Sequence, residues 1–162
     1  PHQIVMVDGG TTALQLAKHL PRELEATIVT HSPTIAVELV EHPKVEVILI
    51  GGKLFKHSVV TVGAAALESI SRIRADIYFM GATGIHKDAG VTTGDLEEAH
   101  IKRALSDHAA ETILLASSEK LNAASPYLIM PLGELNGMIV EREIASDVLE
   151  PFEKAGIVVT RA

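Results

Sequence analysis

The stretch Ile4-Val5-Met6-Val7-Asp8-Gly9-Gly10-Thr11-Thr12, together with the helical run that continues to Leu20, decides the fold class. Four consecutive aliphatic residues are typical of a strand that is buried on both faces. The two glycines allow the chain to turn tightly, and segment 12–20 then carries apolar residues at mixed helical spacing. The pattern predicts a strand, a turn and a helix, which is the opening unit of an α/β domain.

The same alternation continues to the end of the 162 residues. Further strands are expected at 27–29, 45–50, 59–62, 77–80, 112–116, 138–140 and 157–160, and further helices at 34–40, 64–73, 96–110 and 144–152. Continuous aliphatic strands that alternate with helices indicate a parallel sheet covered on both sides. We therefore predict an open, mostly parallel, doubly wound α/β sheet with helices on both faces, in one domain of residues 1–162.

Composition excludes several classes of protein. The chain has no cysteine, which excludes a disulfide framework, a thiol nucleophile and a thiolate metal site. It has no apolar run of ~18 residues and no signal sequence, so we expect no membrane partner and a cytoplasmic location. A net charge of −7 makes this domain a poor binder of nucleic acid. The first residue is Pro1 rather than Met, which indicates a fragment of a longer protein.

No motif points to a metal or a hydrolytic nucleophile. The eight histidines show neither HxH nor HExxH spacing, and no GxSxG elbow is present. We expect no metal, no cofactor and no serine hydrolase chemistry.

Small and hydroxyl-bearing residues follow several of the expected strands. In open parallel sheets, ligands bind beyond the carboxyl ends of the strands. The turn Gly9, Gly10, Thr11 and Thr12 is a candidate phosphate site, because glycines permit close approach and the next helix presents free N–H groups. A plain tight turn with a threonine cap is an equally good interpretation of this turn alone. The remaining pocket residues that we expect are Asp8, Thr30, His31, Ser32, Gly52, Lys53, Gly81, Thr83, Gly84, Glu97, Glu98, Lys102 and Lys120.

The expected helix at 96–110 begins with acidic residues whose role the sequence leaves open. Asp95 and Glu98 have the spacing of a capping box for this helix. In the same way, Ser32 is expected to cap the earlier helix, whose first turn contains Pro33. Glu98 and Lys102 are spaced as an i,i+4 ion pair, in which Glu98 would orient the lysine. A ligand role for these carboxylates and a purely structural role are about equally plausible.

The motifs taken together resemble DeoR-type bacterial transcriptional repressors, in their C-terminal sensor domain. The matching segments cover nearly the whole chain: 7–12, 29–32, 47–54, 75–81, 84–85, 90–93, 97–99, 102–104 and 118–120. Family members commonly have Asn where His31 stands, Asp where Ser117 stands and an aromatic residue where Leu121 stands.

The resemblance implies a fold like that of ribose-5-phosphate isomerase and CoA transferases. It implies an effector domain that binds a phosphorylated sugar or related metabolite, with DNA bound only by an N-terminal helix-turn-helix domain absent from this chain. A sugar-phosphate isomerase or deaminase, with Glu97 or Glu98 as base, is the alternative. Comparison with the isomerases puts Met80, Thr83 and Gly84 where those enzymes carry acidic residues, so we expect binding without catalysis. We also expect a homo-oligomer.

Overall fold

A computed structural model describes residues 2–162 of the chain. Its main feature is a seven-stranded sheet in the order β12-β11-β9-β6-β1-β2-β3, in which all neighbouring strands run parallel. The strands are β1 (Gln3–Val7), β2 (Ala26–Thr30), β3 (Val45–Leu49), β6 (Ala75–Met80), β9 (Ala109–Ala116), β11 (Gly137–Val140) and β12 (Val159–Arg161). The predicted parallel α/β sheet is confirmed, with strand ends that differ from the predicted ones by three residues at most. The strand predicted at 59–62 exists, but it lies outside this sheet, in a small antiparallel one.

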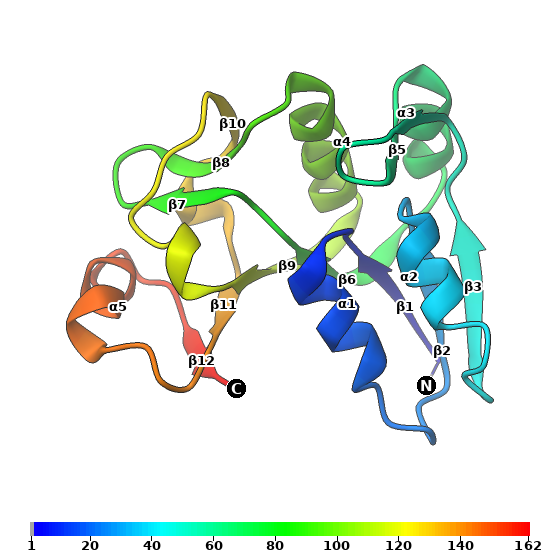
Figure 1. The fold of residues 1–162 in the computed structure, drawn as a ribbon, viewed down its shortest axis with the longest axis horizontal. Helices are drawn as coiled ribbons and strands as arrows, with labels where there is room; N and C mark the ends of the chain where they lie inside the picture. The colour runs from blue at the N-terminus through cyan, green and yellow to red at the C-terminus, as the bar shows by residue number, and fades with distance from the viewer. Residues whose placement is uncertain (1) are drawn as a thin grey trace.

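Helices cover both faces of this sheet, as predicted. Helices α1 (Thr11–Lys18) and α2 (Pro33–Glu38) lie in front of the β1–β3 half in Figure 1. Helices α3 (Ala64–Ser71), α4 (Leu96–Asp107) and α5 (Ser146–Lys154) pack on the opposite face.

Alternate residues of the inner strands β1, β2, β6, β9 and β11 supply the two cores that these helices cover. Met6 of β1 belongs to the larger core, together with Ile101 of α4 and Phe152 of α5. Its neighbour Val7 belongs to the smaller core, together with Ile35 of α2. These inner strands therefore read as continuous aliphatic runs because both of their faces are buried, whereas the edge strands β3 and β12 are largely exposed.

Two small antiparallel sheets were not predicted. One is the hairpin of β4 (Lys53–Phe55) and β5 (Val60–Val62), and the other contains β7 (Gly84–His86), β8 (Gly90–Thr93) and β10 (Tyr127–Met130). Two short 3₁₀ turns, η1 (Ser118–Lys120) and η2 (Leu132–Glu134), follow β9 and β10. Of these five strands only β5 was predicted as a strand, because strands of three or four residues, two of them beginning at glycine, are too short to show a period in sequence.

The order of the strands creates a reversal point beside β1. The chain passes from β1 to β2 and β3 on one side, and then returns to β6 on the other side. Val7 is in register with Phe79, and the Asp8 N–H donates to the Phe79 carbonyl at 3.0 Å. The carboxyl ends of β1 and β6 therefore lie side by side at the position where open α/β sheets bind ligands.

Within residues 2–162, no helix has both the length and the apolar character that crossing a bilayer requires.

Candidate functional site

The Asp8 carboxylate is the centre of the site at the end of β1. Its side chain is buried, and Oδ2 accepts from the Tyr78 hydroxyl at 3.0 Å and from the Gly81 N–H at 2.9 Å. Oδ1 accepts from the Gly9 N–H at 2.9 Å. These donors come from β1 and β6 and from the turns that follow them, so the reversal point itself builds the carboxylate's environment.

Lys102 of α4 supplies the counter-charge. Its side chain is buried, and Nζ donates to Asp8 Oδ2 at 2.5 Å and to the Gly81 carbonyl at 2.9 Å. The expectation that Glu98 orients Lys102 as an i,i+4 partner is therefore wrong. Lys102 points toward the sheet, where Asp8 offers a buried carboxylate that needs a cation.

The electrostatics of this cluster fix its protonation states. Burial acts to raise the pKa of Asp8, but the charge of Lys102 and the proximity of His31 outweigh it and hold that pKa below its usual value. Burial and the Asp8 carboxylate raise the pKa of Tyr78 well above its usual value. Asp8 is therefore ionised and Tyr78 remains a proton donor at neutral pH.

His31 is buried next to the Asp8 carboxylate. Its Nε2 is 3.3 Å from Asp8 Oδ1, and its side chain is only 1% exposed. Burial lowers the pKa of His31 to about 4, against the opposing effect of Asp8. The ring is therefore neutral near pH 7, and its other nitrogen, Nδ1, is buried with no hydrogen-bond partner among the described residues.

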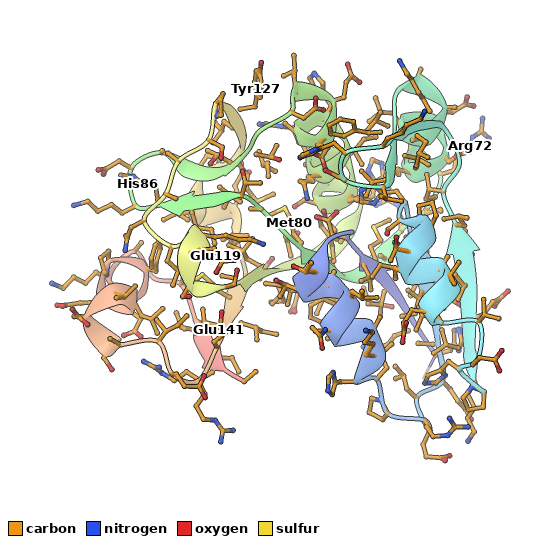
Figure 2. The ribbon with its side chains drawn as sticks, in the orientation of Figure 1. Arg72, Met80, His86, Glu119, Tyr127 and Glu141 are labelled. Carbon is orange, nitrogen blue, oxygen red and sulfur yellow. The ribbon has the colours of Figure 1, made fainter. Side chains whose placement is uncertain are left out.

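A small cavity of about 120 Å³ opens in front of the Asp8–Lys102 pair. Eight of the predicted residues line it: Asp8, Gly9, Gly10, Gly81, Thr83, Glu98, Lys102 and Lys120. Four residues that the sequence did not suggest also line it: Ser58, Val60, Ala82 and Thr93. Figure 2 labels Met80, the last residue of β6, near the middle of the molecule, just before Gly81.

The turn that we expected to hold phosphate borders this cavity through its glycines. Gly10, with φ of 98°, is the N-cap of α1 and offers no side chain to the first turn. The first intrahelical bond runs from the Leu14 N–H to the Gly10 carbonyl. The N–H groups of the first turn are therefore left for another acceptor, and the positive end of the helix dipole lies at the same place.

Glu98 supplies the cavity's second carboxylate. The Asp95 side chain accepts from the Glu98 N–H at 3.0 Å, which confirms the predicted cap and fixes the start of α4. Glu98 Oε2 accepts from the Ser58 hydroxyl at 3.3 Å. Burial raises the pKa of Glu98, and Lys102 only partly opposes that shift.

The other predicted site residues lie outside the lining of this cavity. Thr30, His31 and Ser32 are buried. Ser32 caps α2 by accepting from the Ile35 N–H at 3.3 Å, as predicted. Gly52 packs against Val62 and Ala66.

The remaining predicted residues face other spaces. Thr11 and Thr12 border a neighbouring cavity of about 360 Å³, on the β9 and β11 side of α1. Lys53 and Glu97 border a third cavity of about 440 Å³. Gly84 is enclosed between Ala123 and Thr92.

Two of the missed contacts left a signal in the sequence and two did not. Tyr78 is the one hydroxyl-bearing residue in the run 77–80, and a buried tyrosine hydroxyl requires a partner. Thr93 ends a strand just before the acidic start of α4. Ser58 and Val60 reach the cavity through the β4–β5 hairpin, whose fold the sequence did not predict.

The arrangement has the chemistry of a binding site for a small polar anion. Lys102, Lys120 and the first turn of α1 offer positive charge and N–H donors, while Glu98 offers an acceptor for hydroxyl groups. No group of three or more His, Cys, Asp or Glu side chains in the described part of the chain is arranged to hold a metal ion.

Comparison with known proteins gives one family and several relatives. The model of the DeoR C-terminal sensor domain matches residues 1–142. The HTH-type transcriptional regulator GlpR of Haloferax volcanii is 32% identical over 97% of this chain and 61% of its own length. A putative aga operon transcriptional repressor of Escherichia coli O157:H7 is 30% identical over 97% of this chain and 58% of its own length.

The HTH-type transcriptional repressor GlcR of Bacillus subtilis is 32% identical over 85% of this chain and 53% of its own length. The chain thus spans about six tenths or less of these relatives. Among solved structures, translation initiation factor eIF-2B of Pyrococcus horikoshii has a TM-score of 0.52 at 14% identity, covering 84% of this chain and 55% of its own. That likeness extends to the α/β fold alone.

Proposed function

Because this chain belongs to the family of DeoR C-terminal sensor domains, we propose that it is the effector-binding domain of a transcriptional regulator. The proposed effector is a phosphorylated sugar or a related phosphorylated metabolite, and residues 1–162 form the sensing domain. DNA binding is assigned to another part of the full-length regulator, because phosphate backbones need clustered Lys and Arg and this chain has a net charge of −7.

The observation that carries the proposal is the combination of groups in the cavity at the β1–β6 reversal point. Gly9, Gly10 and Lys120 line it beside the open N-terminus of α1, where a phosphate gains N–H donors and a cation. Glu98 lines it as well and accepts hydrogen bonds from sugar hydroxyls. The cavity thus offers binding partners for both the phosphate group and the hydroxyl groups of one ligand.

The state of Asp8 does not fit the free base that an isomerase requires. Isomerisation needs a positioned base that is free to take a proton. Asp8 already accepts from Lys102, Tyr78 and two backbone N–H groups, and its pKa is lowered. Glu98 is the one other carboxylate among the cavity-lining residues, and we assign it to recognition.

The regulator responds only if the effector binds one of its states more tightly than the other. A coupling of roughly 1–3 kcal/mol changes the affinity for DNA by about 5- to 150-fold. We expect the sensing domain to act within a homo-oligomer, and sedimentation of the full-length protein at micromolar concentration tests that expectation.

The proposal is tested by calorimetric titration with ribose 5-phosphate, glucosamine 6-phosphate and unphosphorylated ribose. Wild-type protein should bind a phosphate ester and not ribose. Lys120→Met should weaken that binding roughly tenfold, because it removes a charge-assisted contact. Lys53→Met, which removes a lysine bordering a different cavity, is the matched control and should leave it unchanged.

Equal affinities in the two lysine variants, or no binding of any phosphate ester, would contradict the proposal. A coupled assay for isomerase or deaminase turnover, abolished by Glu98→Gln, would replace it with the enzymatic alternative.

A further inference from the structure

The turn of the β4–β5 hairpin forms one wall of the cavity, and no motif in the sequence marked it as functional. Ser58 and Val60 of this segment both line the cavity. A Cβ atom on Gly9 would lie 2.5 Å from Val60 Cγ1, so the hairpin sits directly against the Asp8–Gly10 turn. The hairpin is therefore part of the site's construction.

Ser58 reaches across to α4 and holds the Glu98 side chain. Its hydroxyl donates to Glu98 Oε2 at 3.3 Å, and no other side chain of the described residues donates to that carboxylate. The bond leaves Oε1 available to a ligand. The ionised carboxylate is half-buried and has one side-chain donor, so a ligand hydroxyl that donates to Oε1 would stabilise it.

The backbone at this turn is held in a conformation that β-branched residues seldom adopt. Val59 has φ of 53°, in the left-handed region, and its side chain is 41% exposed. Strain of this kind persists where the surrounding structure fixes it, and it is frequent at ligand clamps. Here the contact of Ser58 with Glu98 and the packing of Val60 over Gly9 hold the turn on its two sides.

From this geometry we infer that Ser58 determines the specificity of the site, by positioning the Glu98 carboxylate to accept a hydrogen bond from a hydroxyl group of the ligand. The inference rests on the proposed function and adds to it a requirement that the phosphate ester carry a hydroxyl within reach of Glu98. Glu98 is the contacting residue and Ser58 is a positioning residue.

The test uses two ligands with the same three-carbon chain, glycerol 3-phosphate with two hydroxyls and n-propyl phosphate with none. Wild-type protein should bind glycerol 3-phosphate roughly tenfold more tightly, as expected for one hydrogen bond to a charged acceptor. Ser58→Ala should bring this preference close to one and leave the affinity for n-propyl phosphate unchanged. Ser58→Thr, which keeps the hydroxyl, should restore the preference.

Two further variants keep the result interpretable. Glu98→Ala should abolish the same preference, which tests the contact should Ser58→Ala fail to fold. Ser71→Ala removes an exposed serine hydroxyl at the end of α3 and should retain the full preference.

The outcomes separate this inference from the proposed function. If wild-type protein binds none of the four phosphate esters (glycerol 3-phosphate, n-propyl phosphate, ribose 5-phosphate and glucosamine 6-phosphate), the proposed function fails and this inference fails with it. The inference alone is overturned if wild-type protein binds both esters equally, or if Ser58→Ala keeps the preference or weakens both ligands to the same degree.

Discussion

Lys102 neutralises a carboxylate that has almost no contact with water. Asp8 is 1% exposed and Lys102 is 6% exposed. Lys102→Met keeps much of the side-chain volume but leaves the Asp8 charge without its cation. Removing one partner of a buried pair costs about 3–5 kcal/mol, so we expect a loss of that size in the free energy of unfolding, measured in urea.

An exposed ion pair provides the control for that substitution. Lys154 and Glu150 are 2.7 Å apart at i,i+4 spacing on α5, with both side chains more than half exposed. Lys154→Met should change the free energy of unfolding by less than about 1 kcal/mol. Similar losses in the two variants would show that Asp8 does not depend on Lys102.

His31 makes the stability of the domain depend on pH in a defined window. Burial lowers its pKa from 6.5 to about 4 in the folded chain. Between these values the unfolded chain holds a proton on residue 31 that the folded chain does not. Stability therefore rises with pH across the window, by about 3 kcal/mol in total, and the contribution is constant above pH 6.5.

The measurement is the free energy of unfolding of wild type and His31→Asn from pH 4 to pH 8. The difference between the two curves reports the histidine together with its effect on Asp8, because the other titrating groups are shared. We expect the difference to change between pH 4 and 6.5 and to level off above pH 6.5. Parallel curves across the whole range would contradict the assignment of a buried neutral histidine.

Among the secondary-structure elements, the β4–β5 hairpin combines strain with exposure at one residue. Val59 adopts φ of 53° and is 41% exposed. Its backbone conformation therefore costs free energy, and partial burial of the side chain offsets little of that cost. Asparagine tolerates the left-handed region better than a β-branched residue does. We expect Val59→Asn to raise the free energy of unfolding by roughly 1 kcal/mol.

Val37 of α2, which is exposed and has helical geometry, is the control for that prediction. Val37 is 72% exposed, so Val37→Asn, like Val59→Asn, replaces an exposed apolar side chain. Unlike Val59→Asn, it relieves no backbone strain. It should not stabilise the chain. An increase of similar size in both variants would point to a surface effect and not to the turn.

The inner strands of the sheet were predictable from sequence because they bury both faces. The run 4–7 has no polar residue, and its strand begins one residue earlier, at Gln3. The cap residues Ser32 and Asp95 were predictable as well, because a cap is decided within four residues.

The site contacts that the sequence did not predict join segments that are far apart along the chain. Ser58 meets Glu98 across 40 residues, and Lys102 meets Asp8 across 94. For Lys102, spacing along the helix suggested Glu98 as the partner, but the buried carboxylate on β1 offered the stronger interaction. Local periodicity carries no information about such pairs.

At the scale of the whole molecule, the sheet brings its donors together only in the folded state. Gly9 and Gly10 follow β1, Lys102 belongs to α4 and Lys120 to η1. A ligand that contacts all three segments binds the native chain and not the unfolded one, so it must raise the stability. The shift in the temperature of thermal unfolding therefore reports ligand binding at the site, and the measurement does not require the DNA sequence that the regulator binds.

We expect ribose 5-phosphate or glucosamine 6-phosphate, at about 100 times its dissociation constant, to stabilise the domain by roughly 2.7 kcal/mol. For a chain of this size that corresponds to an increase in Tm of roughly 5–10 °C. Sucrose, an uncharged osmolyte that is excluded from protein surfaces, controls for general stabilisation that does not depend on the site. Lys120→Met should lose most of the response to the sugar phosphate and keep the response to sucrose. If the variant responds to both as wild type does, the anion acts on the surface at large and the cavity beside β1 is not a receptor for phosphate esters.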